Sequence, residues 1–108
     1  MSSSVKIIQP SGILDGITVN SLRREISDIV EGGVNIVLVD FQDVTFMNSS
    51  GLGALVSILR SVRSTGAELF ICSLSEQVKM IFELTKMDRV FKPFANRDEF
   101  EEKVASAR

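Results

Sequence analysis

Two adjacent serines, Ser49 and Ser50, are the residues of this chain whose types and placement best suit chemistry. Asn48 precedes them and Gly51 follows them, so an amide, two hydroxyls and a glycine share one turn before a predicted helix. The first N–H groups of a helix lack intrahelical partners and carry partial positive charge, which favours an anion such as phosphate. The turn is therefore interpreted first as a helix cap, with Ser50 as the capping residue, and second as a site for phosphate chemistry.

Hydrophobic patterns predict the elements on both sides of this turn. Residues 36–41 (Ile-Val-Leu-Val-Asp-Phe) show no polar alternation before Asp40, which is typical of a central strand covered on both faces. After the turn, five apolar residues recur at helical spacing and predict a helix over residues 52–63: Leu52, Leu55, Val56, Leu59 and Val62. The serines therefore lie where the chain passes from a buried strand into an amphipathic helix.

The rest of the chain alternates between short extended runs and helical patterns. We expect extended segments at residues 5–9, 13–14, 68–72 and 90–91, and further helices at residues 17–30, from 75 to about 85, and after 96. This order predicts a single α/β domain with a mixed, mainly parallel sheet of about four to five strands and about four helices. Residues 1–4 are expected to form a flexible tail and residues 5–108 the domain.

Polar residues at the predicted helix ends are candidates for capping. Asp15, Ser75 and Asn96 each stand before a helical pattern, and Gly32-Gly33 is expected to end the first helix with a left-handed residue. Asp15 and Ser75 can also be interpreted as site residues, because α/β proteins commonly place their binding sites in the loops that follow their strands. Both residues are therefore also candidates for contact with a partner.

Composition excludes several classes of function. The 108 residues carry a net charge of −2, no Trp or Tyr, and no basic patch among aromatics, so nucleic acid is not an expected partner. The apolar runs are too short to span a membrane and the N-terminus lacks a signal-peptide pattern, so we expect a cytoplasmic protein without a membrane partner. The absence of His and the single Cys72, expected in the core, argue against a metal site, an internal disulfide or any cofactor.

Three stretches of the chain resemble a STAS domain of the anti-sigma factor antagonist family. The first is residues 12–15 (Gly-Ile-Leu-Asp). The second lies within residues 39–44 and consists of Val39-Asp40-Phe41 together with Asp43 and Val44. The third and most specific is residues 46–53 (Phe-Met-Asn-Ser-Ser-Gly-Leu-Gly). The order of the predicted elements is also that of the family, and the resemblance extends roughly from Val5 to Val104.

The resemblance implies a regulatory protein that binds other proteins and is not an enzyme. In this family the unmodified antagonist binds an anti-sigma factor that is also a serine kinase, and binding frees a sigma factor for transcription. The kinase phosphorylates the second residue of the serine pair, which here is Ser50. Phosphorylation ends the binding, and a metal-dependent phosphoserine phosphatase restores the active form. No catalytic group is then needed within the chain.

Asn48 is the one departure from the family pattern, which usually has Asp directly before the serine pair. Asn keeps the size, the turn-forming tendency and a hydrogen-bonding oxygen of Asp, and it lacks the negative charge beside an incoming phosphoryl group. Two consequences are open: easier phosphorylation through weaker repulsion, or slower phosphorylation without a carboxylate that orients the serine.

The predicted site thus consists of a phosphoacceptor and a surface for the partner. Ser50 is the predicted phosphoacceptor, and the predicted partner-binding residues are Asp15, Asn48, Ser49, Ser50, Gly51, Leu52 and Ser75. Gly51 and Gly53 are interpreted either as places where a partner approaches closely, or as a tight turn and a small residue where the helix crosses the sheet. The phenylalanines and Met47 are expected in the core rather than in an interface.

Two other functions remain as alternatives. One keeps the fold and makes the chain a STAS subunit of a larger assembly, such as a stress-sensing complex or a lipid-transport ATPase, in which Ser50 is never phosphorylated. The other is a small hydrolase, and it has little support because the chain lacks His, a phosphate-loop Lys and a G-x-S-x-G motif. The oligomeric state is open.

Overall fold

Five parallel strands form two small sheets in the computed structural model of the protein, which describes residues 4–105. The main sheet has the order β1-β3-β5, and its strands are β1 (Val5–Ile8), β3 (Ile36–Asp40) and β5 (Glu68–Cys72). A second sheet pairs β2 (Ser11–Leu14) with β4 (Asp43–Met47). The expected α/β class is confirmed, and every strand pair among residues 4–105 is parallel.

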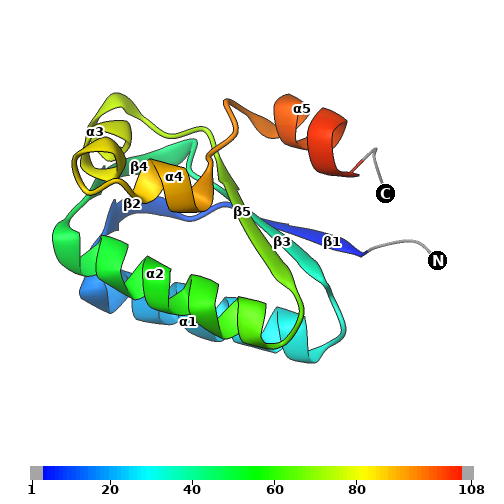
Figure 1. Ribbon diagram of the computed structural model, residues 1–108. Coiled ribbons are helices and arrows are strands. Elements are labelled where there is room, and N and C mark those ends of the chain that lie inside the picture. The colour runs from blue at the N-terminus through cyan, green and yellow to red at the C-terminus, as the bar shows by residue number, and fades with distance from the viewer. Residues whose placement is uncertain (1–3, 106–108) are drawn as a thin grey trace.

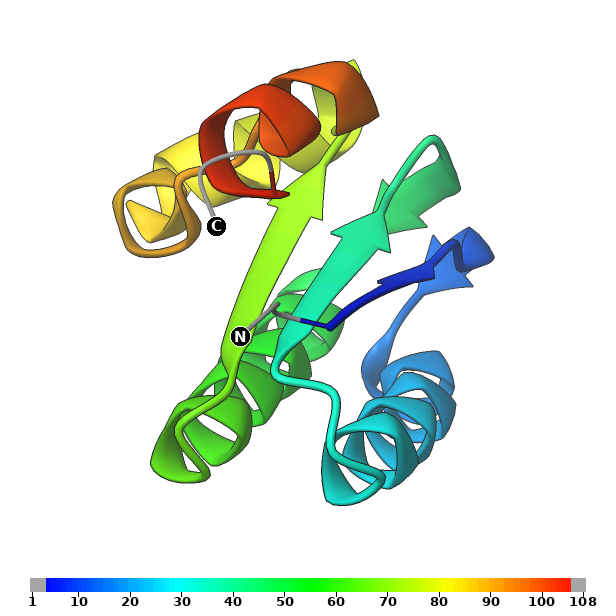
Figure 2. The ribbon, with the colours of Figure 1, turned by 90° about the vertical axis from the view of Figure 1, so that its right-hand side faces the viewer.

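Helices cover both faces of the main sheet. On one face α1 (Gly16–Glu31) and α2 (Ser49–Ser64) lie side by side, and both begin at the end of the molecule where β2 and β4 lie (Figure 1). The opposite face is covered by α5 (Arg97–Phe100) and the π-helical turn η1 (Glu101–Ala105), as Figure 2 shows. Two shorter helices, α3 (Glu76–Leu84) and α4 (Met87–Phe91), pack together, and α3 contacts β4.

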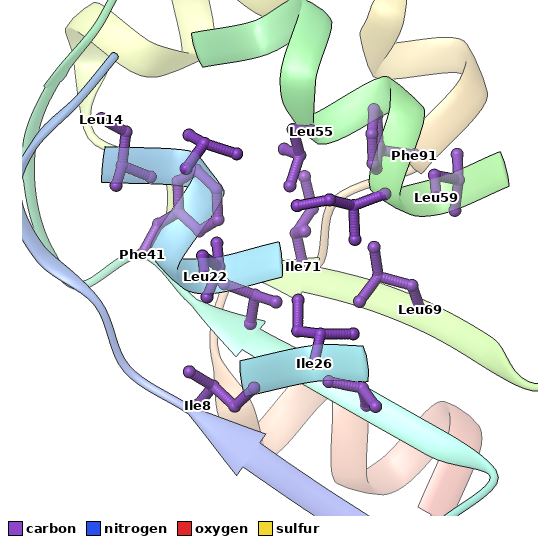
Figure 3. Packing of buried hydrophobic residues seen from close by; sticks show 14 of the residues in the cluster. Ile8, Leu14, Leu22, Ile26, Phe41, Leu55, Leu59, Leu69, Ile71 and Phe91 are labelled. Atoms are coloured by element: carbon purple, nitrogen blue, oxygen red, sulfur yellow. The ribbon is translucent and has the colours of Figure 1, made fainter. Parts of the chain in front are cut away.

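The core follows from this layering. Side chains of α1, α2 and β5 point toward one another in the larger cluster, as Leu22, Leu55 and Ile71 do in Figure 3. All five residues of β3 are buried, because a smaller cluster on the other face joins β3 to Phe100 and Val104. This confirms β3 as a central strand covered on both faces. Cys72 is also fully buried, and this burial raises the pKa of its thiol, so it is a core residue as expected.

The end of α1 matches its sequence prediction. Gly33 has a φ of +103°, and its N–H donates to the carbonyl of Val30, while the N–H of Val34 donates to the carbonyl of Ile29. These two bonds satisfy carbonyls that the helix leaves unpaired, and the left-handed residue reverses the chain toward β3.

The strand predicted at residues 90–91 is wrong, since these residues end the helix α4. Two apolar residues suggested a strand, but Phe91 is buried against Phe82 of α3, with ring centroids 5.5 Å apart. Left-handed residues bound this helical turn on both sides, with φ angles of 64° at Lys86 and 48° at Lys92. The chain returns to the sheet only at Phe94, which bridges to Cys72.

The strand β4 was missed by the sequence analysis because a bulge interrupts its alternation. Gly12 pairs with Val44 but Ile13 pairs with Phe46, so Thr45 is an extra residue in β4. Beyond the bulge the inward positions shift by one, which buries Met47 as expected and turns Phe46 outward with 43% of its surface exposed. The expectation that every phenylalanine lies in the core is therefore wrong for Phe46.

Within residues 4–105, no helix combines the length and the apolar character that crossing a membrane requires. Of the predicted tail, residues 1–4, only Ser4 belongs to the described part of the chain, and its N–H donates to the side chain of Asn35.

Candidate functional site

Helix α2 begins three residues earlier than its apolar pattern indicated, and this changes the role of Ser50. The N-cap is Asn48, whose Oδ1 accepts a hydrogen bond of 2.8 Å from the N–H of Gly51. Ser49 and Ser50 are the first two residues of the helix. The interpretation of Ser50 as the capping residue is therefore wrong, because Ser50 lies within the helix and Asn48 accepts the capping hydrogen bond.

The two serine side chains are open to solvent. Both residues are exposed, and within residues 4–105 neither hydroxyl makes a hydrogen bond to a neighbouring group. Each hydroxyl stands on the first turn of a 16-residue helix, where partial positive charge and free N–H groups stabilise a negative group. The position is thus suited to carry a phosphoryl group without displacing an existing contact.

The start of α2 lies directly against the start of α1. A Cβ atom added to Gly51 would stand 2.2 Å from the carbonyl oxygen of Leu14, so only glycine fits there. A Cβ on Gly16 would be 3.5 Å from the Cβ of Ser50, and the N–H of Asn48 donates to the Leu14 carbonyl at 3.4 Å. This confirms the expected proximity of the Asp15 loop to the serine turn.

Gly53 behaves differently from Gly51. It is exposed, and a Cβ added to it would meet nothing within 4 Å. The interpretation of Gly53 as a small residue at the crossing of helix and sheet is therefore wrong, since the helix touches the neighbouring chain at Gly51 instead. Gly53 leaves the exposed face of α2 flat within a turn of Ser50.

Asp15 caps α1 as predicted, and it does so with a full reciprocal capping box. Its Oδ1 accepts from the N–H groups of Ile17 and Thr18 at 3.0 and 2.9 Å, while the Thr18 hydroxyl accepts from the N–H of Asp15 at 2.8 Å. The bond from the Thr18 N–H, with those from the Thr18 hydroxyl and the Ile17 N–H, lowers the pKa of Asp15 below 3.8 against an opposing desolvation. Asp15 is thus a carboxylate held beside the serine turn.

The loop before α3 borders the turn through the end of β4. Ser75 caps α3, as predicted, by accepting a hydrogen bond from the N–H of Val78 at 3.4 Å. Two residues later, the side-chain amide of Gln77 binds both backbone groups of Met47, the residue before Asn48. This contact was not predicted, because nothing in a glutamine near a helix start indicates a partner 30 residues away.

The predicted partner-binding residues divide into two groups by exposure. Ser49 and Ser50 are exposed and Asn48, Asp15 and Ser75 are partly exposed, so their side chains are accessible. The other two, Gly51 and Leu52, are buried and shape the surface from beneath.

Exposed apolar residues close to the turn were not predicted. Ile17 is 80% exposed at the second position of α1, and Ile13 and Phe46, paired across β2 and β4, are 55% and 43% exposed. The exposure of Ile17 could have been predicted from the sequence, because this residue does not share the helical spacing of the buried residues Leu22 and Ile26. Apolar side chains around a polar centre are typical of a surface that binds another protein.

The buried carboxylate of Asp40 belongs to a structural network. Burial alone would raise its pKa, but hydrogen bonds from the Arg97 guanidinium at 2.5 Å and from the Gln42 N–H at 2.9 Å hold the pKa below 3.8. Arg97 also donates to Gln9, which donates to Asp43, so the network ties α5 to the starts of β2 and β4. It secures the C-terminal helices and supplies no free acid or base.

Ser50 presents an exposed side chain at the start of α2. Among residues 4–105, no cluster of three or more His, Cys, Asp or Glu side chains could hold a metal ion. Two shallow cavities, of about 320 and 370 Å³, are lined by none of the residues 48–52. Ser50 therefore lies on the exposed surface and outside both of these cavities.

The sequence and the fold resemble those of known proteins. The STAS domain profile matches residues 2–103. The anti-sigma-B factor antagonist of Staphylococcus aureus is 30% identical over 78 residues, which are 72% of each chain. The crystal structure of protein TM1081 from Thermotoga maritima superposes with a TM-score of 0.83 at 29% identity, over 93% of this chain and 86% of that one. The Bacillus cell fate determinant SpoIIAA in its phosphorylated form shares the fold, with a TM-score of 0.69 at 23% identity over 96% and 94% of the chains.

Proposed function

The chain belongs to the STAS domain family, among the anti-sigma factor antagonists, and we propose that it acts as an antagonist controlled by phosphorylation of Ser50. In this proposal the unmodified protein binds an anti-sigma factor that is also a serine kinase, and so frees a sigma factor. The kinase phosphorylates Ser50, the complex dissociates, and a metal-dependent phosphoserine phosphatase restores the unmodified form. The chain itself is not an enzyme.

The single observation that carries this proposal is the geometry of Ser50. Its hydroxyl is exposed on the first turn of α2, while Asn48 alone caps the helix. A phosphoryl group on Ser50 adds about −1.5 to −2 charges at a helix N-terminus, where the partial positive charge favours it. Phosphorylation is therefore compatible with the intact fold, because no contact of the unmodified protein has to be broken to accommodate the phosphoryl group.

The change in binding then arises at the surface. Ser49, Ser50 and the partly exposed Asp15 are polar residues at the starts of the two helices. Ile17, Ile13 and Phe46 are exposed apolar residues of α1, β2 and β4, the elements that adjoin these starts. A phosphoryl group on Ser50 brings negative charge and volume to the place where the partner packs closely. Repulsion and steric block, rather than refolding, then end the complex.

The test is incubation of the purified chain with the anti-sigma factor kinase of the same organism and Mg²⁺–ATP, followed by intact mass and site mapping. One phosphoryl group is expected on Ser50, none on the Ser50→Ala variant, and one on Ser49→Ala. The two variants are matched, because both serines are exposed residues of the same helical turn.

Modification of Ser49 instead of Ser50 would overturn the assignment of the acceptor. If no genomically linked kinase modifies the protein, the alternative of a non-switching STAS subunit in a larger assembly takes its place.

A further inference from the structure

Gln77 makes an unusual pair of hydrogen bonds at the edge of the second sheet. Its Oε1 accepts from the N–H of Met47 at 2.9 Å, and its Nε2 donates to the carbonyl oxygen of the same residue at 3.1 Å. The strand β4 pairs only with β2, so its other edge has no neighbouring strand in the described part of the chain. The amide of Gln77 thus satisfies the last residue of that edge as a neighbouring strand would.

Met47 connects this contact to the phosphoacceptor turn. Met47 pairs with Leu14 in β2, and the next residue, Asn48, donates its N–H to the Leu14 carbonyl. Asn48 then caps α2 through Gly51. The strand end is therefore held on both edges, by β2 on one side and by Gln77 on the other, immediately before the helix that carries Ser50.

Gln77 is itself fixed in place. It is partly buried on the first turn of α3, whose N-terminus is capped by Ser75 and whose residues Val78 and Phe82 are fully buried in the core. A short, doubly hydrogen-bonded link therefore joins a rigid helix to the residue three positions before Ser50. An amide pair of this kind constrains both the position and the rotation of the peptide it binds.

We propose that Gln77 is a positioning residue for phosphoryl transfer to Ser50, an inference that rests on the function proposed above. In the transfer, Oγ of Ser50 bonds to the γ-phosphorus of the ATP held by the kinase, the bond from that phosphorus to ADP breaks, and the hydroxyl proton passes to a base of the kinase. Gln77 takes no part in these bond changes. It holds the start of α2 so that Oγ stands in line with the phosphorus.

The expected loss of rate follows from how strongly the rate of phosphoryl transfer depends on the position of the reacting oxygen. A displacement of the reacting atom by roughly 1 Å costs on the order of a hundredfold in rate. Loss of Gln77 leaves the Asn48 cap and the Leu14 contact in place, so we expect a smaller loss of about tenfold. Because the surface that meets the kinase is otherwise unchanged, the loss should fall on kcat and leave KM for this protein within about twofold.

Three variants of the chain test the inference with the same kinase and Mg²⁺–ATP. Gln77→Ala removes both hydrogen bonds. Gln77→Glu keeps an acceptor for the N–H of Met47 and loses the donor to its carbonyl, so its kcat should lie between those of the wild type and Gln77→Ala. Gln42→Ala is the matched control, since Gln42 is an exposed glutamine whose side chain makes no hydrogen bond to another residue among 4–105.

A second measurement separates positioning from stability. Amide hydrogen exchange at Met47 should quicken at least about tenfold in Gln77→Ala, while amides in the middle of α2 keep their wild-type protection. If Gln77 only stabilised the fold, the Gln77→Ala variant would instead show faster amide exchange throughout the protein and a lower melting temperature. Its kcat would then not fall selectively while KM stayed the same.

The outcomes distinguish this inference from the function on which it rests. If wild type is phosphorylated on Ser50 and Gln77→Ala reacts with the same kcat, the positioning role is wrong and the proposed function stands. If the wild type is not phosphorylated on Ser50, both fail. An unfolded Gln77→Ala together with a Gln77→Glu that reacts like the wild type would also contradict positioning.

Discussion

The starts of α1 and α2 occupy equivalent places in the fold and carry different chemistry. Both helices have 16 residues, and each follows a strand of the two-stranded sheet, in which Leu14 pairs with Met47. The next residues, Asp15 and Asn48, are the two N-caps. The caps differ in charge, because Asp15 is a carboxylate within a reciprocal capping box and Asn48 is a neutral amide with one hydrogen bond.

The difference continues at the second residue of each helix, and it is the reason why the proposed function assigns the phosphoacceptor to α2 and not to α1. Ile17 holds this position in α1 and is an exposed apolar side chain, while Ser50 holds it in α2 and is an exposed hydroxyl. At α1 the negative charge is already present and bonded. At α2 no carboxylate occupies the helix end, so the partial positive charge there is available to a phosphoryl group on Ser50.

The largest effect on stability is expected from Gly51→Ala, because this substitution forces the starts of α1 and α2 apart. The new Cβ would stand 2.2 Å from the Leu14 carbonyl oxygen and 2.9 Å from its carbon, and backbone atoms cannot yield as a flexible side chain does. The substitution should lower the free energy of unfolding by about 1–3 kcal/mol. Urea denaturation measures this as a lower midpoint at an unchanged slope.

Gly53→Ala is the matched control for that substitution. It places the same methyl group two residues further along the helix, in open space, and should stabilise the protein by about 0.5–1 kcal/mol through the better helix propensity of Ala. Equal effects of the two substitutions would mean that α2 does not rest on Leu14 as described.

The next largest effect is expected from removing the cap of α2. Asn48→Ala leaves the N–H of Gly51 without its partner and should cost about 1 kcal/mol of stability, while Asn20→Ala, on the exposed face of α1, should not destabilise. Asn48→Asp makes the two caps alike and should stabilise α2 by about 0.3–1 kcal/mol at neutral pH. A stable Asn48→Ala would show that another group caps the helix.

Ile17→Ser makes the second residues of the two helices alike and tests the surface rather than the fold. Since Ile17 is 80% exposed, the free energy of unfolding should change by less than about 0.5 kcal/mol. Binding to the anti-sigma factor kinase should weaken by about fivefold, because an apolar neighbour of Ser50 is lost. Titration calorimetry checks the binding, and unaltered affinity would remove Ile17 from the partner surface.

The smallest effect concerns the titration of Asp15. Hydrogen bonds to its ionised form, first of all from the N–H of Thr18, lower the pKa of this carboxyl in the folded protein. Its contribution to stability is therefore present above 3.8, its usual value, and is lost as the pH falls through the lower folded value. NMR titration of the carboxyl carbon should give a midpoint below 3.8, shifted upward in Thr18→Val, and a midpoint at or above 3.8 would contradict the capping box.

Much of the fold could be predicted from the sequence because most elements bury a regular apolar pattern. The strand β5 was predicted to the residue, and β3 was assigned correctly as a strand covered on both faces. The errors arise where a pattern is short or interrupted. The bulge at Thr45 hid β4, and two apolar residues at 90–91 suggested a strand in place of a helical turn.

The start of α2 was predicted in part for a related reason. The apolar stripe of α2 starts at Leu52, but the helix starts at Ser49, because the first turn of a helix needs a cap and no core contact. Ser50 was therefore identified correctly as a helix-start residue, but the cap is Asn48. The assignment of Ser50 as the phosphoacceptor stays a prediction. The contact between Gln77 and Met47 could not be predicted, since it joins residues 30 positions apart.

The central claim is that a phosphoryl group at the start of α2 ends partner binding and leaves the fold intact. The most direct test measures the affinity of the proposed anti-sigma factor kinase for the chain with and without phosphate on Ser50. We predict that phosphorylation weakens binding by about a hundredfold or more, that is by about 2.8 kcal/mol, while the melting temperature of the chain stays nearly unchanged. Equal affinity of the two forms, or unfolding of the phosphorylated chain, would contradict the account.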